Sequence, residues 1–118
     1  RNGDHRLPLR LDGDDLTPIS VHVDGAKVST HTDGAALVVP IGSDRAVVET
    51  EVAIAPEKNS QLMGLYASGG LLCTQCEAEG FRRITFFPDR PDVLSRYRVR
   101  MSADKARFPV LLANGNPV

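Results

Sequence analysis

The chain has 118 residues and a formal net charge of −1. This length suffices for one domain with a core that depends on neither a metal nor disulfides. Lysine and arginine are scattered, so the composition gives no electrostatic basis for binding nucleic acid or an anionic membrane. No apolar run approaches the roughly 20 residues of a membrane span, and no signal-peptide pattern opens the chain. We therefore expect a single domain over residues 1–118, in a chain that looks cut at both ends.

The first part of the chain predicts an antiparallel meander. Apolar and polar residues alternate over 19–23, and Asp-Gly pairs at 24–25 and 33–34 are typical of tight hairpins. We expect a return strand over 27–32 and a third strand over 36–39.

Further strands are expected toward the C-terminal end. Residues 48–54 alternate apolar side chains with glutamates that should face water, and Pro56 should end this strand. Alternation over 97–101 sets an apolar face against a basic face formed by arginines, and 108–113 is a last apolar run. Single helical turns are expected within 78–83 and at 93–95.

The pattern as a whole predicts an all-β antiparallel domain, a sandwich or a saddle-like sheet with one or two short helical turns. Alternation also predicts which side chains form its core. These are Leu9, Leu11, Val21, Val23, Val52, Ile54, Val99 and Leu111.

The stretch over 71–87, LLCTQCEAEGFRRITFF, places polar groups in what otherwise reads as a buried strand. With period-2 alternation, Cys73, Gln75 and Glu77 share one face. A carboxylate beside an amide oxygen on a rigid strand could hold a small cation such as a primary ammonium. The alternative is a strand end with ordinary solvated carboxylates, among them Glu79.

Cys73 and Cys76 have the spacing of a redox pair or of half a zinc site. In an extended run this spacing sends the two sulfurs to opposite faces, and a redox pair instead needs a helix N-terminus to lower the thiol pKa. A zinc site would need further ligands that are not nearby. We expect two reduced cysteines in a cytoplasmic protein, and no metal or other cofactor in this chain.

The motifs TQCEAEGFR (74–82) and FFPDRPDVL (86–94) resemble the N-terminal domain of the zinc-dependent gluzincin aminopeptidases, in particular their bacterial branch. The resemblance continues through PLRLDGDDL (8–16) and FPVLLANGN (108–116), and covers nearly the whole chain. In the family this domain begins with further strands and continues further along the chain. The resemblance therefore implies a partial N-terminal β-domain.

The resemblance also implies a function. The residue matching Glu77 accepts hydrogen bonds from the α-ammonium group of a peptide substrate, and the one matching Gln75 lines the same pocket. The zinc and its ligands belong to a thermolysin-like domain of the same polypeptide, which is expected to be absent here, so this chain alone should be inactive. Glu79 matches no such role and is left as a structural residue. A non-catalytic β-sandwich module that binds a protein partner remains the alternative.

Overall fold

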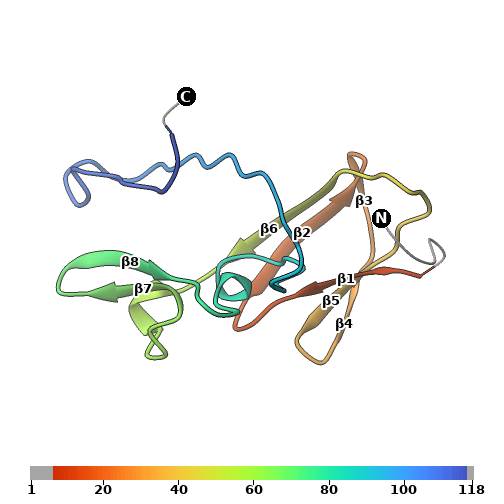
Figure 1. Ribbon diagram of the computed structural model, residues 1–118, viewed down its shortest axis with the longest axis horizontal. Helices are drawn as coiled ribbons and strands as arrows, with labels where there is room; N and C mark the ends of the chain where they lie inside the picture. Colours follow the sequence, from red (N-terminus) through yellow and green to blue (C-terminus); the bar gives the residue numbers. More distant parts are fainter. Residues whose placement is uncertain (1–6, 117–118) are drawn as a thin grey trace.

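The computed structural model describes residues 7–116, and Figure 1 shows the course of the chain. Within these residues eight strands form three antiparallel sheets, with two short 3-10 helices and no α-helix. The all-β antiparallel prediction is therefore confirmed. No helix in this range has the length and apolar character needed to cross a membrane. The expectations for the two ends concern residues outside the described range.

The first sheet has the strand order β1 (Leu9–Asp12), β5 (Ala36–Val39), β4 (His31–Asp33). All four residues of β5 are buried, because this central strand has a neighbour on each side and the molecule's core against one face. Arg10 and Asp33 form an ion pair between the two outer strands. The hydrogen bond from Arg10 lowers the pKa of Asp33.

The second sheet has the order β3 (Ala26–Lys27), β2 (Thr17–Val23), β6 (Val48–Ala53). Glu49 and Glu51 of β6 are exposed, as the alternation predicted. β6 ends at Ala53, and a 3-10 helix, η1 (Pro56–Lys58), begins at Pro56.

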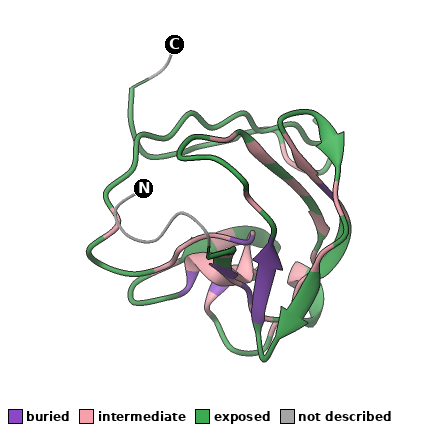
Figure 2. Ribbon diagram, turned by 90° about the vertical axis from the view of Figure 1, so that its right-hand side faces the viewer, coloured by how far each residue is buried: buried purple, intermediate pink, exposed green. Residues whose placement is uncertain are grey.

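These two sheets share one hydrophobic core. It contains residues of both sheets together with Phe86, and Figure 2 shows the buried residues gathered in the lower part of that view. Among the predicted core residues, Leu11 and Val21 are buried, while Leu9, Val23 and Val52 pack against the core and are partly buried. Ile54 is half-buried.

The predicted single return strand over 27–32 is wrong, and with it the continuous meander. Hairpin turns form at both Asp-Gly pairs, with positive φ at Asp24, Gly25 and Gly34. However, β3 pairs with β2 and β4 pairs with β5. Only the two or three residues next to each turn pair with the strand on its other side. The return segment therefore passes from one sheet to the other.

The third sheet is a hairpin of β7 (Gly64–Ser68) and β8 (Leu71–Gln75), which projects to the left in Figure 1. β7 was not predicted from the sequence pattern. The expectation of a buried strand at β8 is wrong, since Leu71 is 66% exposed. Only two strands form this sheet, and its packing partners are η1 and a second 3-10 helix, η2 (Phe81–Arg83).

The strands expected at 97–101 and 108–113 are wrong, because residues 88–116 contain no strand. Figure 1 shows this segment running away from the sheets before it folds back on itself. A strand needs a hydrogen-bonded neighbour, and no described segment supplies one here. Val99 and Leu111 are therefore exposed rather than part of the core.

Of the two helical turns expected, the first is confirmed by η2, which lies within 78–83. The second is wrong. Residues 93–95 form no helix, and Pro91 and Asp92 lie in a turn instead.

Candidate functional site

The segment after β8 turns sharply instead of continuing as a strand. Gln75 is the last residue of β8 and pairs with Gly64 of β7. The backbone N–H of Gly80 donates to the carbonyl of Cys76 at 2.8 Å, and residues 77–80 form turns. Glu77 therefore lies beyond the strand. The prediction that it shares one strand face with Cys73 and Gln75 is wrong, because this turn ends the extended period.

The turn nevertheless brings the two predicted site residues together. Gln75 Nε2 donates to the backbone carbonyl oxygen of Glu77 at 3.0 Å. The Glu77–Ala78 peptide bond is cis. The side chains of Gln75 and Glu77 are both exposed. Within residues 7–116 no cation pairs with the Glu77 carboxylate, and no donor reaches the side-chain oxygen of Gln75. The hydrogen-bond acceptors of both side chains therefore stay available.

The residues that follow tie this turn to the core. Arg82 of η2 bonds to Asp89, and the backbone N–H of Asp89 donates to the side chain of Asp12 in β1 at 2.9 Å. Glu79 lies 3.5 Å from Arg82 and is largely exposed. Burial acts to lower the pKa of Arg82, but its hydrogen bond to Asp89 and the nearby carboxylates raise that pKa overall.

Three aromatic rings pack beside the same segment. Phe81 and Phe87 meet edge to face with centroids 5.1 Å apart, and Tyr97 lies 5.9 Å from each. Edge-to-face packing is favourable for such rings. Tyr97 thereby holds the start of the C-terminal segment against η2.

Cys73 and Cys76 are both free thiols. Burial raises the pKa of the Cys76 thiol, and the charge of Asp89 adds to this effect. A redox-active cysteine needs the opposite shift, because the thiolate is the reactive form. These surroundings argue against a thioredoxin-type pair.

The described residues do not fit a catalytic zinc. No group of three or more His, Cys, Asp or Glu side chains in this range could hold a metal ion. The printed sequence also contains no H-E-x-x-H motif. Any zinc chemistry would thus require ligands from outside the described residues.

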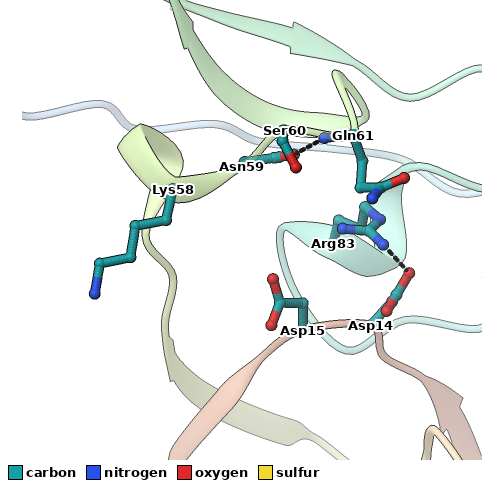
Figure 3. A pocket seen from close by; sticks show the side chains of 7 residues that line it. All are labelled: Asp14, Asp15, Lys58, Asn59, Ser60, Gln61 and Arg83. Carbon is teal, nitrogen blue, oxygen red and sulfur yellow. Dashed lines mark hydrogen bonds and ion pairs between the residues drawn. The ribbon is translucent and has the colours of Figure 1, made fainter.

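A small polar pocket of about 280 Å³ is lined in part by Arg83 of η2, and Figure 3 shows its lining. Arg83 pairs with Asp14 at 2.7 Å across it. Its lining residues are Asp14, Asp15, Lys58, Asn59, Ser60, Gln61 and Arg83. They come from three separate segments, so no local pattern in the sequence could have indicated this pocket. Neither Gln75 nor Glu77 lines it.

These features define an all-β domain with an acidic, acceptor-rich turn between the projecting hairpin and η2. Residues 14–118 match the peptidase M1 N-terminal domain, so the chain belongs to that family. The resemblance found in the sequence is confirmed.

The relatives agree with this assignment. The chain is 53% identical over 121 residues to aminopeptidase N of Caulobacter vibrioides and 47% identical over 119 residues to aminopeptidase N of Escherichia coli K12, with all of this chain aligned in both cases. The crystal structure of Legionella pneumophila aminopeptidase A in complex with aspartic acid matches 96% of this chain with a TM-score of 0.87 and 30% identity. The chain spans about 14% of the length of each of these proteins.

Proposed function

We propose that this chain is part of the N-terminal β-domain of a zinc-dependent aminopeptidase, and that Gln75 and Glu77 hold the free α-amino group of a peptide substrate. Membership of the M1 N-terminal family and similarity to aminopeptidase N support the enzyme class. The observation that carries the site is the contact between Gln75 and Glu77, which groups two sets of acceptors in one exposed turn.

The chemistry of the two side chains fits an ammonium ligand. A carboxylate is an acceptor-only group with a negative charge, and an α-ammonium group offers three donors with a positive charge. Because the amide nitrogen of Gln75 is engaged by the Glu77 carbonyl, its oxygen is the atom that faces a ligand as an acceptor. A blocked amino terminus would leave the carboxylate without a charged partner, so the site would select peptides with a free amino terminus.

The rest of the reaction belongs to other residues. The catalytic zinc would be held by a thermolysin-like domain of the same polypeptide, which is the expected intramolecular partner of this one. Peptides are the proposed substrates. A cytoplasmic location stays a prediction that rests on the two unpaired cysteines.

The test is Glu77→Gln in the full-length enzyme, compared with Glu79→Gln. Losing one partner of a desolvated ion pair typically costs about 2–5 kcal/mol. This corresponds to roughly 30-fold to several thousand-fold in kcat/KM. Glu77→Gln should therefore lower kcat/KM for an aminoacyl substrate at least about tenfold. Glu79→Gln should change it little, because Glu79 is 60% exposed and its ion pair with Arg82 is long, at 3.5 Å.

Thermal melts of both variants control for unfolding. Small and equal effects at the two positions would mean that the acidic turn is only a solvated surface. That result would favour the alternative of a non-catalytic interaction module.

A further inference from the structure

Three hydrogen bonds between Arg82 and Asp89 hold the segment that directly follows the Glu77 turn. Asp89 Oδ2 accepts from the backbone N–H of Arg82 at 3.0 Å and from its Nε at 3.1 Å. Arg82 Nη2 donates to the backbone carbonyl of Asp89 at 2.7 Å. The guanidinium group thus donates hydrogen bonds to both the side chain and the backbone of Asp89.

Asp89 is in turn fixed to the core. Its backbone N–H donates to Asp12 Oδ2 at 2.9 Å, across 77 positions of sequence. Asp12 and Phe87 exchange two backbone hydrogen bonds, at 2.8 and 3.1 Å, which add a bridge to the edge of β1. The first sheet therefore helps to set the position of Arg82, through Asp12 and Asp89.

The link from Arg82 back to Glu77 is short. The backbone N–H of Arg83 donates to the Gly80 carbonyl at 3.1 Å, and the N–H of Gly80 closes the turn on Cys76 at 2.8 Å. Glu77 lies inside that turn. A movement of η2 would be passed to it through two consecutive backbone hydrogen bonds.

A second arginine–aspartate pair nearby serves as a comparison. Arg90 donates to both carboxylate oxygens of Asp92, at 3.0 and 2.7 Å, but the two residues are two positions apart and are 63% and 66% exposed. The side chains of Arg82 and Asp89 are 23% and 14% exposed. A local, exposed ion pair contributes little to stability. A partly buried pair that joins separate segments restrains their relative position.

We propose that Arg82 and Asp89 are positioning residues that hold the Glu77 turn in register with β1 and so maintain selectivity for a free α-amino group. This inference rests on the proposed function of Glu77. Neither residue needs to touch the substrate. Each acts through η2 and the turn closed by Gly80.

The experiment measures amino-group selectivity in the full-length enzyme. Two competitive inhibitors that lack a scissile amide bond are compared, phenylalaninol and 3-phenylpropanol, which differ only in the α-amino group. Selectivity is the inhibition constant of the compound without the amino group divided by that of the compound with it, so a high ratio means a strong preference for the amino group. Asp89→Ala should lower this ratio about tenfold, the size expected when a hydrogen-bonded charge pair is lost. Asp92→Ala, the matched control, should change it less than about twofold.

Two further variants keep the test decisive if Asp89→Ala fails to fold. Asp89→Asn retains an acceptor and should shift the ratio in the same direction by a smaller factor. Arg82→Lys retains the charge but cannot grip both atoms of Asp89, so it should also lower the ratio, whereas Arg90→Lys should not. Thermal melts identify variants that are only destabilised.

A double-mutant cycle with Glu77→Gln separates the possible outcomes. If Asp89 acts through Glu77, Asp89→Ala should change the ratio little in the Glu77→Gln background. If Glu77→Gln lowers the ratio but Asp89→Ala weakens both inhibitors equally, the positioning role is overturned and the proposed function stands. If Glu77→Gln itself leaves the ratio unchanged, both the proposed function and this inference are overturned.

Discussion

Gly80 lies where the chain turns tightly back on Gln75 and Cys76. A Cβ atom there would lie 2.7 Å from the carbonyl oxygen of Gln75 and 2.8 Å from the Cα of Cys76. Both contacts are with backbone atoms, which cannot move aside as the end of a flexible side chain can. The glycine therefore permits the approach that closes the Glu77 turn.

Gly80→Ala should consequently destabilise the chain by about 1–3 kcal/mol, the usual cost of forcing an extra methyl group into a packed site. Gly42→Ala is the matched control, because a Cβ at Gly42 would meet nothing within 4 Å. Its effect should stay within about 0.5 kcal/mol. Urea denaturation of both variants measures the difference. Equal midpoints would show that the turn can relax around the added methyl group.

The raised pKa of Cys76 gives a pH-dependent prediction at the same scale. Burial is the main cause, so the folded chain favours the neutral thiol more than the unfolded chain does. This contribution to stability is fully present below the unfolded thiol pKa of about 8.5 and declines as the pH rises through the folded pKa.

Alkylation by iodoacetamide in a Cys73→Ser variant isolates Cys76. The alkylation rate of Cys76 should rise with pH, and its midpoint should lie at a higher pH in the folded chain than in the denatured chain. A midpoint at a lower pH in the folded chain would contradict the burial argument and would again favour a redox-active thiol.

At the scale of elements, β5 is the strand on which the core depends. Leu37 is 1% exposed and belongs to the cluster shared by two sheets. Leu37→Ala should cost about 2–5 kcal/mol through lost burial and the cavity left behind. Leu94→Ala, at a residue that is 94% exposed, should stay within about 0.5 kcal/mol. Chemical denaturation of the two variants compares them directly, and similar losses would mean that the core is not centred on β5.

The fate of the predicted elements has a physical explanation. Asp-Gly turns and the alternation over 48–53 are local signals, and the structure follows them. β7 was missed because Leu65, Tyr66 and Ala67 show no alternation of apolar and polar side chains. Residues 97–101 alternate regularly and still form no strand. Alternation indicates which face a strand would bury, but not whether a neighbouring strand exists.

The same distinction applies to the site. Gln75 and Glu77 could be selected from the sequence because they are close along the chain and carry suitable chemistry. Their contact comes from a turn and not from the strand period used to predict it. The contact between Asp12 and Asp89 joins residues 77 positions apart, so only the folded chain could show it.

At the scale of the whole molecule, apolar side chains of the C-terminal segment are largely exposed. Tyr97, Val99, Val110 and Leu112 are examples. The chain also spans only about 14% of the length of its relatives. Kinetic tests of Glu77 and Asp89 therefore belong in the full-length protein, where the surroundings of the turn are complete.

The isolated 118-residue chain should accordingly hydrolyse no aminoacyl substrate and bind no stoichiometric zinc. A catalytic zinc site needs three protein ligands and an open position for water or substrate. The described residues offer no such ligand group, and Glu77 is proposed to recognise the amino group without acting on the scissile bond. Hydrolysis of aminoacyl amides and metal analysis of the purified chain test this, with the full-length enzyme as the positive control. Turnover above a buffer blank, or about one zinc per chain, would show that catalytic groups reside in this domain.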